Sequence, residues 1–250
     1  MNKYFALILL LISGPLFAAF AAVESSTSGN AGFGTTFELG LPATIGADSV
    51  IIGCIALDGN NSPLSTSETG VSLLGGGEAG TGGGGASAAC FCKAADGTED
   101  GTSWTIENGA VSENGEYISY SWTGTFDNTC SSVEAATFAT ATSATSDPPS
   151  LNPAGWDVED TVWLLVSGID WNTGKTLSSY PTDCDDNQIN EDGASGTAEI
   201  ATCTRNFASA SWDPGVFTWD TSDDVIAGTM AIRPAASSND DAIMRRRRDN

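Results

Sequence analysis

Short apolar or alternating stretches follow one another along most of the chain, and clusters of Gly, Asn, Asp, Ser and Pro separate them. No stretch repeats its apolar residues with the sustained 3.6 period of an amphipathic helix. The pattern therefore predicts about eleven β-strands. These predicted strands cover residues 37–41, 50–57, 71–74, 87–94, 103–106, 117–123, 135–142, 162–169, 198–205, 216–219 and 225–232. We expect an all-β fold, an antiparallel two-sheet β-sandwich of jelly-roll type, in a single domain over residues 35–234.

Two of these strands indicate how the layers are arranged. Residues 116–123 alternate, which places Ile118, Tyr120 and Trp122 on one face and leaves the other face of this strand to water. Residues 162–166 (VWLLV) do not alternate, so this strand is expected in the middle of its sheet, covered on both faces.

Two segments have the composition of irregular structure. Residues 22–34 are small and polar, which predicts a flexible leader. Residues 75–86 (GGGEAGTGGGGA) predict a mobile hairpin loop, because so many glycines are costly to order.

The first 21 residues have the pattern of an export signal. A lysine at position 3 precedes an apolar run over residues 5–12, and Ala19-Phe20-Ala21 has the small-x-small form of a cleavage site. We predict a signal peptide over residues 1–21 with cleavage near Ala21. An uncleaved anchor is the alternative, although the apolar run is short for a membrane span.

Charge and composition exclude several classes of function. The chain holds 9 basic and 32 acidic residues among 250, a net charge of −23, which disfavours nucleic acids and anionic membrane surfaces as partners. It contains no histidine, which excludes Ser-His-Asp and Cys-His nucleophile systems. Many carboxylates are available for glycoside hydrolysis, but the sequence singles out no pair. We therefore predict a protein that is not an enzyme, with glycoside hydrolysis as a third hypothesis.

Six cysteines are present, an even number behind a predicted export signal, which favours disulfides. Cys90 and Cys92 lie two apart in a predicted strand, so their side chains share a face and each needs a different partner. The sequence leaves the connectivity open. The disulfide candidates are Cys54, Cys90, Cys92, Cys130, Cys184 and Cys203.

One acidic segment has the oxygen ligands that calcium prefers. It departs from the EF-hand pattern, because Gln188 and Ala194 occupy the positions of the invariant glycine and of the bidentate glutamate. Solvated surface acids are the alternative interpretation, and no other cofactor is expected. The candidate calcium ligands are Asp183, Asp185, Asp186, Asn187, Glu191 and Asp192.

Tryptophans suggest a second binding site. Trp171 lies between Asp170 and Asn172 in a turn-like stretch, and an indole beside a carboxylate and an amide suits stacking on a sugar ring. Four other tryptophans fall in predicted strands and are expected in the core, whereas the remaining two stay open. The four are Trp104, Trp122, Trp163 and Trp219, and the two are Trp156 and Trp212.

Residues 235–250 end in four consecutive arginines and predict a disordered tail. Docking of these arginines onto the acidic face of a neighbouring copy is the alternative, which would make the protein a homo-oligomer.

Several short segments, in this order along the chain, resemble structural proteins of tailed phages. They are residues 93–99 (KAADGTE), 146–151 (SDPPSL), 160–164 (DTVWL), 180–181 (YP), 212–218 (WDPGVFT), 223–227 (DDVIA) and 231–234 (AIRP). The chain looks like tail, fibre or capsid-accessory proteins of marine and metagenomic viruses. The resemblance implies a β-sandwich virion component without catalytic residues. The export signal departs from this pattern, because tailed phages assemble in the cytoplasm.

The sequence thus leads to a virion structural or host-attachment protein that presents loops to other virion subunits or to a host-surface receptor. A secreted adhesin or lectin-like carbohydrate-binding module is the alternative. The expected location is the virion surface or the extracellular space.

Overall fold

The computed structural model describes residues 22–60, 63–109, 112–123, 130–158, 160–170, 175–191 and 198–233. Within these ranges the fold is all-β, and the one helical element is a single 3-10 turn, η1 (Cys130–Ser132). The predicted fold class is confirmed. The described residues include no helix long and apolar enough to cross a membrane.

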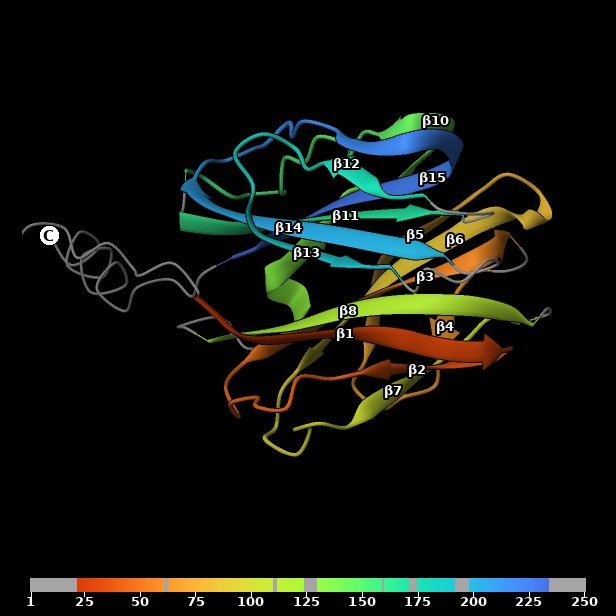
Figure 1. Cartoon of the computed structure of the whole chain (residues 1–250). Coiled ribbons are helices and arrows are strands. Elements are labelled where there is room, and N and C mark those ends of the chain that lie inside the picture. Colours follow the sequence, from red (N-terminus) through yellow and green to blue (C-terminus); the bar gives the residue numbers. More distant parts are fainter. Residues whose placement is uncertain are drawn as a thin grey trace, which may run out of the picture.

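Three antiparallel sheets form the molecule, stacked as Figure 1 shows. The five-stranded sheet has the order β1 (Ala22–Gly34), β8 (Glu113–Thr123), β3 (Val50–Asn60), β6 (Gly82–Ala94) and β5 (Ser72–Ala79). The seven-stranded sheet has the order β10 (Ala139–Ser146), β15 (Phe217–Ile232), β11 (Asp160–Ile169), β14 (Glu199–Ala208) and β13 (Asp185–Asn190), while β12 (Leu177–Ser179) and β9 (Val133–Ala135) also pair with β15. The three-stranded sheet has the order β2 (Thr36–Gly40), β7 (Ser103–Glu107) and β4 (Ser65–Thr66).

The main core lies between the two large sheets. Ile118, Tyr120 and Trp122 of β8 are buried there, on the face that the alternating pattern predicts. The Tyr120 hydroxyl reaches the Thr202 hydroxyl on β14 at 2.5 Å, so the phenol gains a hydrogen bond inside this core.

The opposite face of β8 is also buried, which corrects the expectation that it is wet. Ser119 and Ser121 are fully buried, and the Ser119 hydroxyl donates a hydrogen bond to the Gly40 carbonyl at 2.7 Å. The three-stranded sheet covers this side with a second apolar cluster that includes Phe37, Leu39 and Trp104. Serine suits both environments because its small side chain packs closely and bonds to a nearby backbone. The alternation of apolar and polar residues in β8 therefore indicates which side chains are polar, and it does not indicate which face is exposed to solvent.

β11 confirms the prediction of a strand covered on both faces. Leu164 and Val166 belong to the main core, whereas Trp163 and Leu165 belong to a third apolar cluster on the outer face of the seven-stranded sheet.

Residues 22–34 form β1 and not a leader, because they pair with β8 from Ala22–Thr123 to Gly34–Glu113. An edge strand pairs through backbone hydrogen bonds on one side only. A segment of mostly small polar residues can therefore form such a strand without many large apolar side chains. β1 therefore belongs to the sandwich domain.

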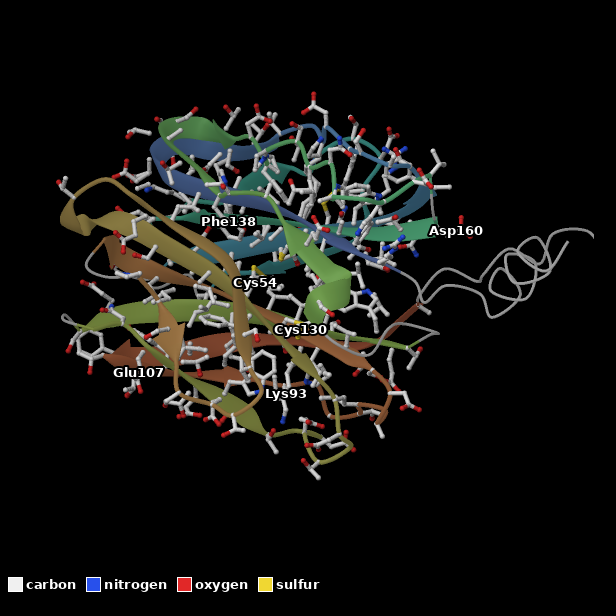
Figure 2. The ribbon with its side chains drawn as sticks, turned by 180° about the vertical axis from the view of Figure 1, so that it is seen from behind. Cys54, Lys93, Glu107, Cys130, Phe138 and Asp160 are labelled. Carbon is white, nitrogen blue, oxygen red and sulfur yellow. A yellow bond between two sulfur atoms is a disulfide. The ribbon has the colours of Figure 1, made fainter. Side chains whose placement is uncertain are left out.

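Residues 75–86 form most of a β-hairpin, β5 and β6, and not a mobile loop. The turn falls at Gly80, whose φ of 72° is in the left-handed region that favours glycine. A Cβ on Gly75 would lie 2.9 Å from the Phe138 ring, so glycine here lets the aromatic ring pack against the strand. Figure 2 shows Phe138 beside this hairpin.

Most other predicted strands are present, but two of them are joined into one strand and another is divided into two. Residues 216–219 and 225–232 belong to one strand, β15, while residues 135–142 are divided between β9 and β10. The predicted signal peptide (residues 1–21) and tail (residues 235–250) lie outside the described residues.

All six cysteines form disulfides, Cys54–Cys90, Cys92–Cys130 and Cys184–Cys203. The prediction that Cys90 and Cys92 have different partners is confirmed. Cys54 and Cys90 face each other on β3 and β6, whereas Cys92–Cys130 connects the five-stranded sheet to the turn that leads into β9. Cys54 is fully buried and Cys130 partly buried; Figure 2 labels both.

Candidate functional site

Three of the predicted calcium ligands, Asp185, Asp186 and Asn187, lie in a strand and not in a loop. Residues 185–190 are β13, and Gln188 pairs with Thr202 on β14. Within the described part of the chain, no group of three or more His, Cys, Asp or Glu residues is arranged to hold a metal ion. Calcium binding stays a prediction of the sequence.

The individual acids of this segment make separate contacts. Asp183 forms an ion pair with Arg205 at 3.5 Å. Asp186 accepts a hydrogen bond from the Thr204 hydroxyl at 3.4 Å, and Glu191 accepts one from the Leu177 backbone at 3.3 Å. Asp192 lies outside the described residues.

The predicted sugar site is described only at Asp170, because Trp171 and Asn172 lie outside the described residues. Asp170 is fully buried, and the sugar site stays a prediction of the sequence.

The other tryptophans are all buried, including the two that the sequence left open. Trp104, Trp122, Trp163 and Trp219 belong to apolar clusters, as predicted. Trp156 and Trp212 join the cluster on the outer face of the seven-stranded sheet, where the Trp212 ring meets Trp163 edge-on at 5.8 Å.

Asp170 belongs to a group that we call the lysine–carboxylate cluster, made of Asp58, Glu113, Asp170, Lys175 and Asp223. These residues come from strands β3, β8 and β15 and from the two ends of the connection between β11 and β12. Strand pairing brings them together at one end of the sandwich, because Leu57 pairs with Gly115 in one sheet and Ile169 with Val225 in the other.

Lys175 is the centre of the cluster and is 6% exposed. Its Nζ donates a hydrogen bond to the Asp170 carbonyl oxygen at 2.7 Å and contacts Asp223 Oδ2. The Asp170 N–H donates to the Asp224 carbonyl at 3.0 Å, and the Asp224 N–H donates to Asp223 Oδ1 at 2.9 Å. Backbone groups therefore hold both partners of the ion pair in place.

Two carboxyl groups of this cluster share a hydrogen bond, Asp58 and Asp170. Burial, the hydrogen bond from Asp58 and the negative charges of Asp58 and Asp223 raise the pKa of Asp170 to about 8, against the effect of Lys175. Burial also raises the pKa of Asp58. At neutral pH the pair therefore retains a proton, because two adjacent buried carboxylates do not both ionise easily.

Further carboxyl groups are buried near this end. Glu116 accepts hydrogen bonds from Asn30 at 2.8 Å and from Asn190. Glu199 pairs with Ile169, the neighbour of Asp170, and burial together with the charge of Glu191 raises its pKa to about 8. Both are almost fully buried.

The cluster combines an amine, a carboxyl group in contact with it, and a neighbouring pair that holds a proton. Such a group can transfer protons between buried side chains, and perturbed carboxyl groups of this kind mark candidate functional sites. Open grooves lie elsewhere, one along β5 and β6 beside Leu73 and Gly76, another along β10.

Sequence reasoning named Asp170 for a different role and missed the other four members of the cluster, Asp58, Glu113, Lys175 and Asp223. One signal was present, because Lys175 is one of three lysines in a strongly acidic chain. The partners were hidden, since they come from strands far apart in the sequence.

Comparisons with protein-family models, with curated proteins and with solved structures find no match to this chain.

Proposed function

We propose that the protein is an exported attachment or structural module that does not act as an enzyme. The observation that carries this proposal is the set of three disulfides, which indicates an oxidising, extracellular environment. The predicted export signal over residues 1–21 is consistent with that environment.

Cys54–Cys90 joins neighbouring strands of one sheet, whereas Cys92–Cys130 connects the five-stranded sheet to the turn before β9. Cys92–Cys130 closes 38 residues of chain and Cys54–Cys90 closes 36, and a disulfide across a loop of this length stabilises a fold by about 4 kcal/mol. Both involve cysteines that are fully buried on β6. A protein that displays a surface outside the cell gains resistance to unfolding from such links.

The net charge of the chain restricts which binding partners its surface favours. A net charge of −23 repels nucleic acids and anionic membranes, so neutral glycans and neutral or cationic protein surfaces are the expected partners. Three acids at this end of the sandwich, Glu113, Asp170 and Glu199, are buried, which supports display over hydrolysis.

Export of the full chain from a bacterium tests the proposal. We expect a periplasmic or secreted product whose N-terminus lies near Ala22, with no thiol accessible to alkylation after denaturation. The matched control starts at residue 22 and stays in the cytoplasm, where its cysteines are reduced. A full chain that stays in the cytoplasm with free thiols contradicts the proposal.

Attachment is tested on the exported product. We expect it to bind one class of glycan or cell-surface protein on an array, without turnover of polysaccharides. Turnover that disappears when one carboxylate is neutralised would instead identify a glycoside hydrolase.

Virion membership is the second candidate, and it is motivated by the resemblance of several short segments to tailed-phage structural proteins. If this candidate holds, the protein sediments with viral particles. A freely secreted product supports the adhesin or lectin-like module instead.

A further inference from the structure

We propose that Lys175 and Asp223 condense into an amide, so that the mature protein carries a covalent cross-link between the start of β12 and β15. The proposal concerns the lysine–carboxylate cluster and does not depend on where the protein acts. Its test is the mass of the purified chain, so its failure is distinguishable from failure of the proposed function.

The two reacting groups are already in contact. Lys175 Nζ lies against Asp223 Oδ2, and their side chains are only 6% and 21% exposed. The Asp170 carbonyl oxygen, at 2.7 Å, fixes the position of Nζ. Two groups held together in this way react as though at very high concentration, because the entropic cost of bringing them together is met during folding.

A backbone donor is placed to stabilise the transition state. The Asp224 N–H donates a hydrogen bond to Asp223 Oδ1 at 2.9 Å, so Oδ1 can carry the negative charge that develops when an amine attacks Cγ. Oδ2, which contacts Lys175, is then the oxygen that departs.

The neighbouring carboxyl pair supplies and accepts protons. Asp170 lies close enough to interact electrostatically with both Lys175 and Asp223, and its pKa is raised to about 8 by burial and by Asp58. Its carboxyl group is therefore protonated at neutral pH and acts as a general acid. After giving up its proton it acts as a base.

The reaction balances without any other reagent. A proton passes from the Lys175 ammonium to the Asp223 carboxylate, and the neutral amine then attacks Cγ, forming the C–N bond. Asp170 protonates the Oδ2 hydroxyl, the Cγ–Oδ2 bond breaks and one water molecule leaves. The nitrogen returns one proton to Asp170, so the ammonium and the carboxylate become an amide and water. No oxidation or reduction occurs.

A second lysine provides a natural control within the same chain. Lys93 Nζ lies 2.9 Å from Glu99 Oε1, a similar pair. Glu99 also accepts hydrogen bonds from the N–H groups of Asp96, Gly97 and Thr98, and its pKa is lowered to about 2. This carboxylate is held in its charged form, so we expect no condensation there.

Mass spectrometry of the purified, folded, full-length product tests the proposal. After reduction and alkylation of the cysteines, we expect an intact mass below the calculated mass by one water molecule. Trypsin should fail to cleave after Lys175, and a branched peptide should join the segments that contain Lys175 and Asp223.

Variants locate the lost water. The Lys175→Arg and Asp223→Ala variants should have the full mass, and Asp170→Asn should condense more slowly or not at all. Lys93→Arg, the matched control, should lose the water as the wild type does. If the pair variants fail to fold, the peptide map of the wild type still decides the question.

Two results would overturn the proposal. One is a wild-type chain of full mass that trypsin cleaves after Lys175. The other is a loss of one water molecule in an unbranched peptide, for example by cyclisation at Asp96-Gly97.

Discussion

The two lysines that the structure describes, Lys93 and Lys175, differ in their surroundings more than in their contacts. Lys93 pairs with Glu99, a carboxylate that backbone N–H groups surround, whereas Lys175 pairs with Asp223 among further acids at the end of the sandwich. For Glu99, the hydrogen bonds from Lys93 and from the backbone outweigh the effect of burial and lower its pKa to about 2. For Asp170, burial and the nearby acids prevail and raise its pKa to about 8. The comparison shows that the neighbours of an ion pair, and not the pair itself, decide whether a site holds a charge or a proton.

Replacement of each lysine by methionine gives the largest expected difference in the free energy of unfolding between the Lys175 and Lys93 regions. Lys175→Met removes the group that neutralises Asp223, as ion pair or as amide, and leaves its carboxylate unpaired among further acids, which should lower the free energy of unfolding by about 4 kcal/mol. Lys93→Met should cost about 2 kcal/mol, because backbone N–H groups still hold Glu99. Urea unfolding with the disulfides intact measures both. Equal losses would contradict the importance of the surroundings.

Neutralisation of Glu99 tests the other side of the comparison. A carboxyl group whose pKa is lowered on folding contributes stability above its ordinary pKa, and this contribution disappears as the pH falls toward about 2. Glu99→Gln should therefore cost about 2 kcal/mol at neutral pH and much less near pH 3. Thermal unfolding across this range is the measurement. Exposed Asp100 offers a control as Asp100→Asn, although it accepts one hydrogen bond from the Ile45 backbone.

Replacement of Asp58 should remove part of a pH dependence of stability that is opposite in direction to that of Glu99. The raised pKa values of Asp58 and Asp170 mean that the folded state keeps a proton that the unfolded chain releases above its ordinary pKa. Stability from this pair is therefore greatest in acid and declines until the pH reaches about 8. Asp58→Asn should flatten this decline by about 1 kcal/mol, because an amide replaces the shared proton. An unchanged slope in unfolding experiments between pH 5 and pH 8 would argue against a shared proton.

The smallest effect is expected at the exposed ion pair of Asp183 and Arg205. The Asp183 side chain is 69% exposed, so solvent screens the interaction. Asp183→Asn should change the free energy of unfolding by less than about 0.5 kcal/mol. The same urea series provides the measurement, and a loss comparable to that of Lys175→Met would show that exposure is a poor guide here.

The sequence was informative wherever side-chain pattern and burial coincide. The continuous run of β11 and the alternation of β8 predicted strands and their main core face correctly. It was misleading where backbone pairing alone orders a segment, as in serine-rich β1 and glycine-rich β5 and β6, because backbone hydrogen bonds leave no mark on composition. Likewise, the polar face of β8 gave no sign of the three-stranded sheet that covers it.

The candidate site was beyond prediction for a different reason. Asp58 and Asp223 are two acids among 32, and nothing local distinguishes them, while Asp170 was named only for its neighbour Trp171. The proton that Asp58 and Asp170 retain depends on the pairing of β3 with β8 and of β11 with β15, which a single sequence does not specify.

The pairing of β1 with β8 also constrains the order of folding. β1 is made first during synthesis, yet its partner strand follows only after β2 to β7, so the first sheet edge has to wait for a distant segment. A waiting strand that was rich in large apolar residues would invite aggregation, whereas one dominated by serine, threonine and glycine stays soluble while unpaired. The polar composition of β1 thus suits a chain that completes its outermost strand late.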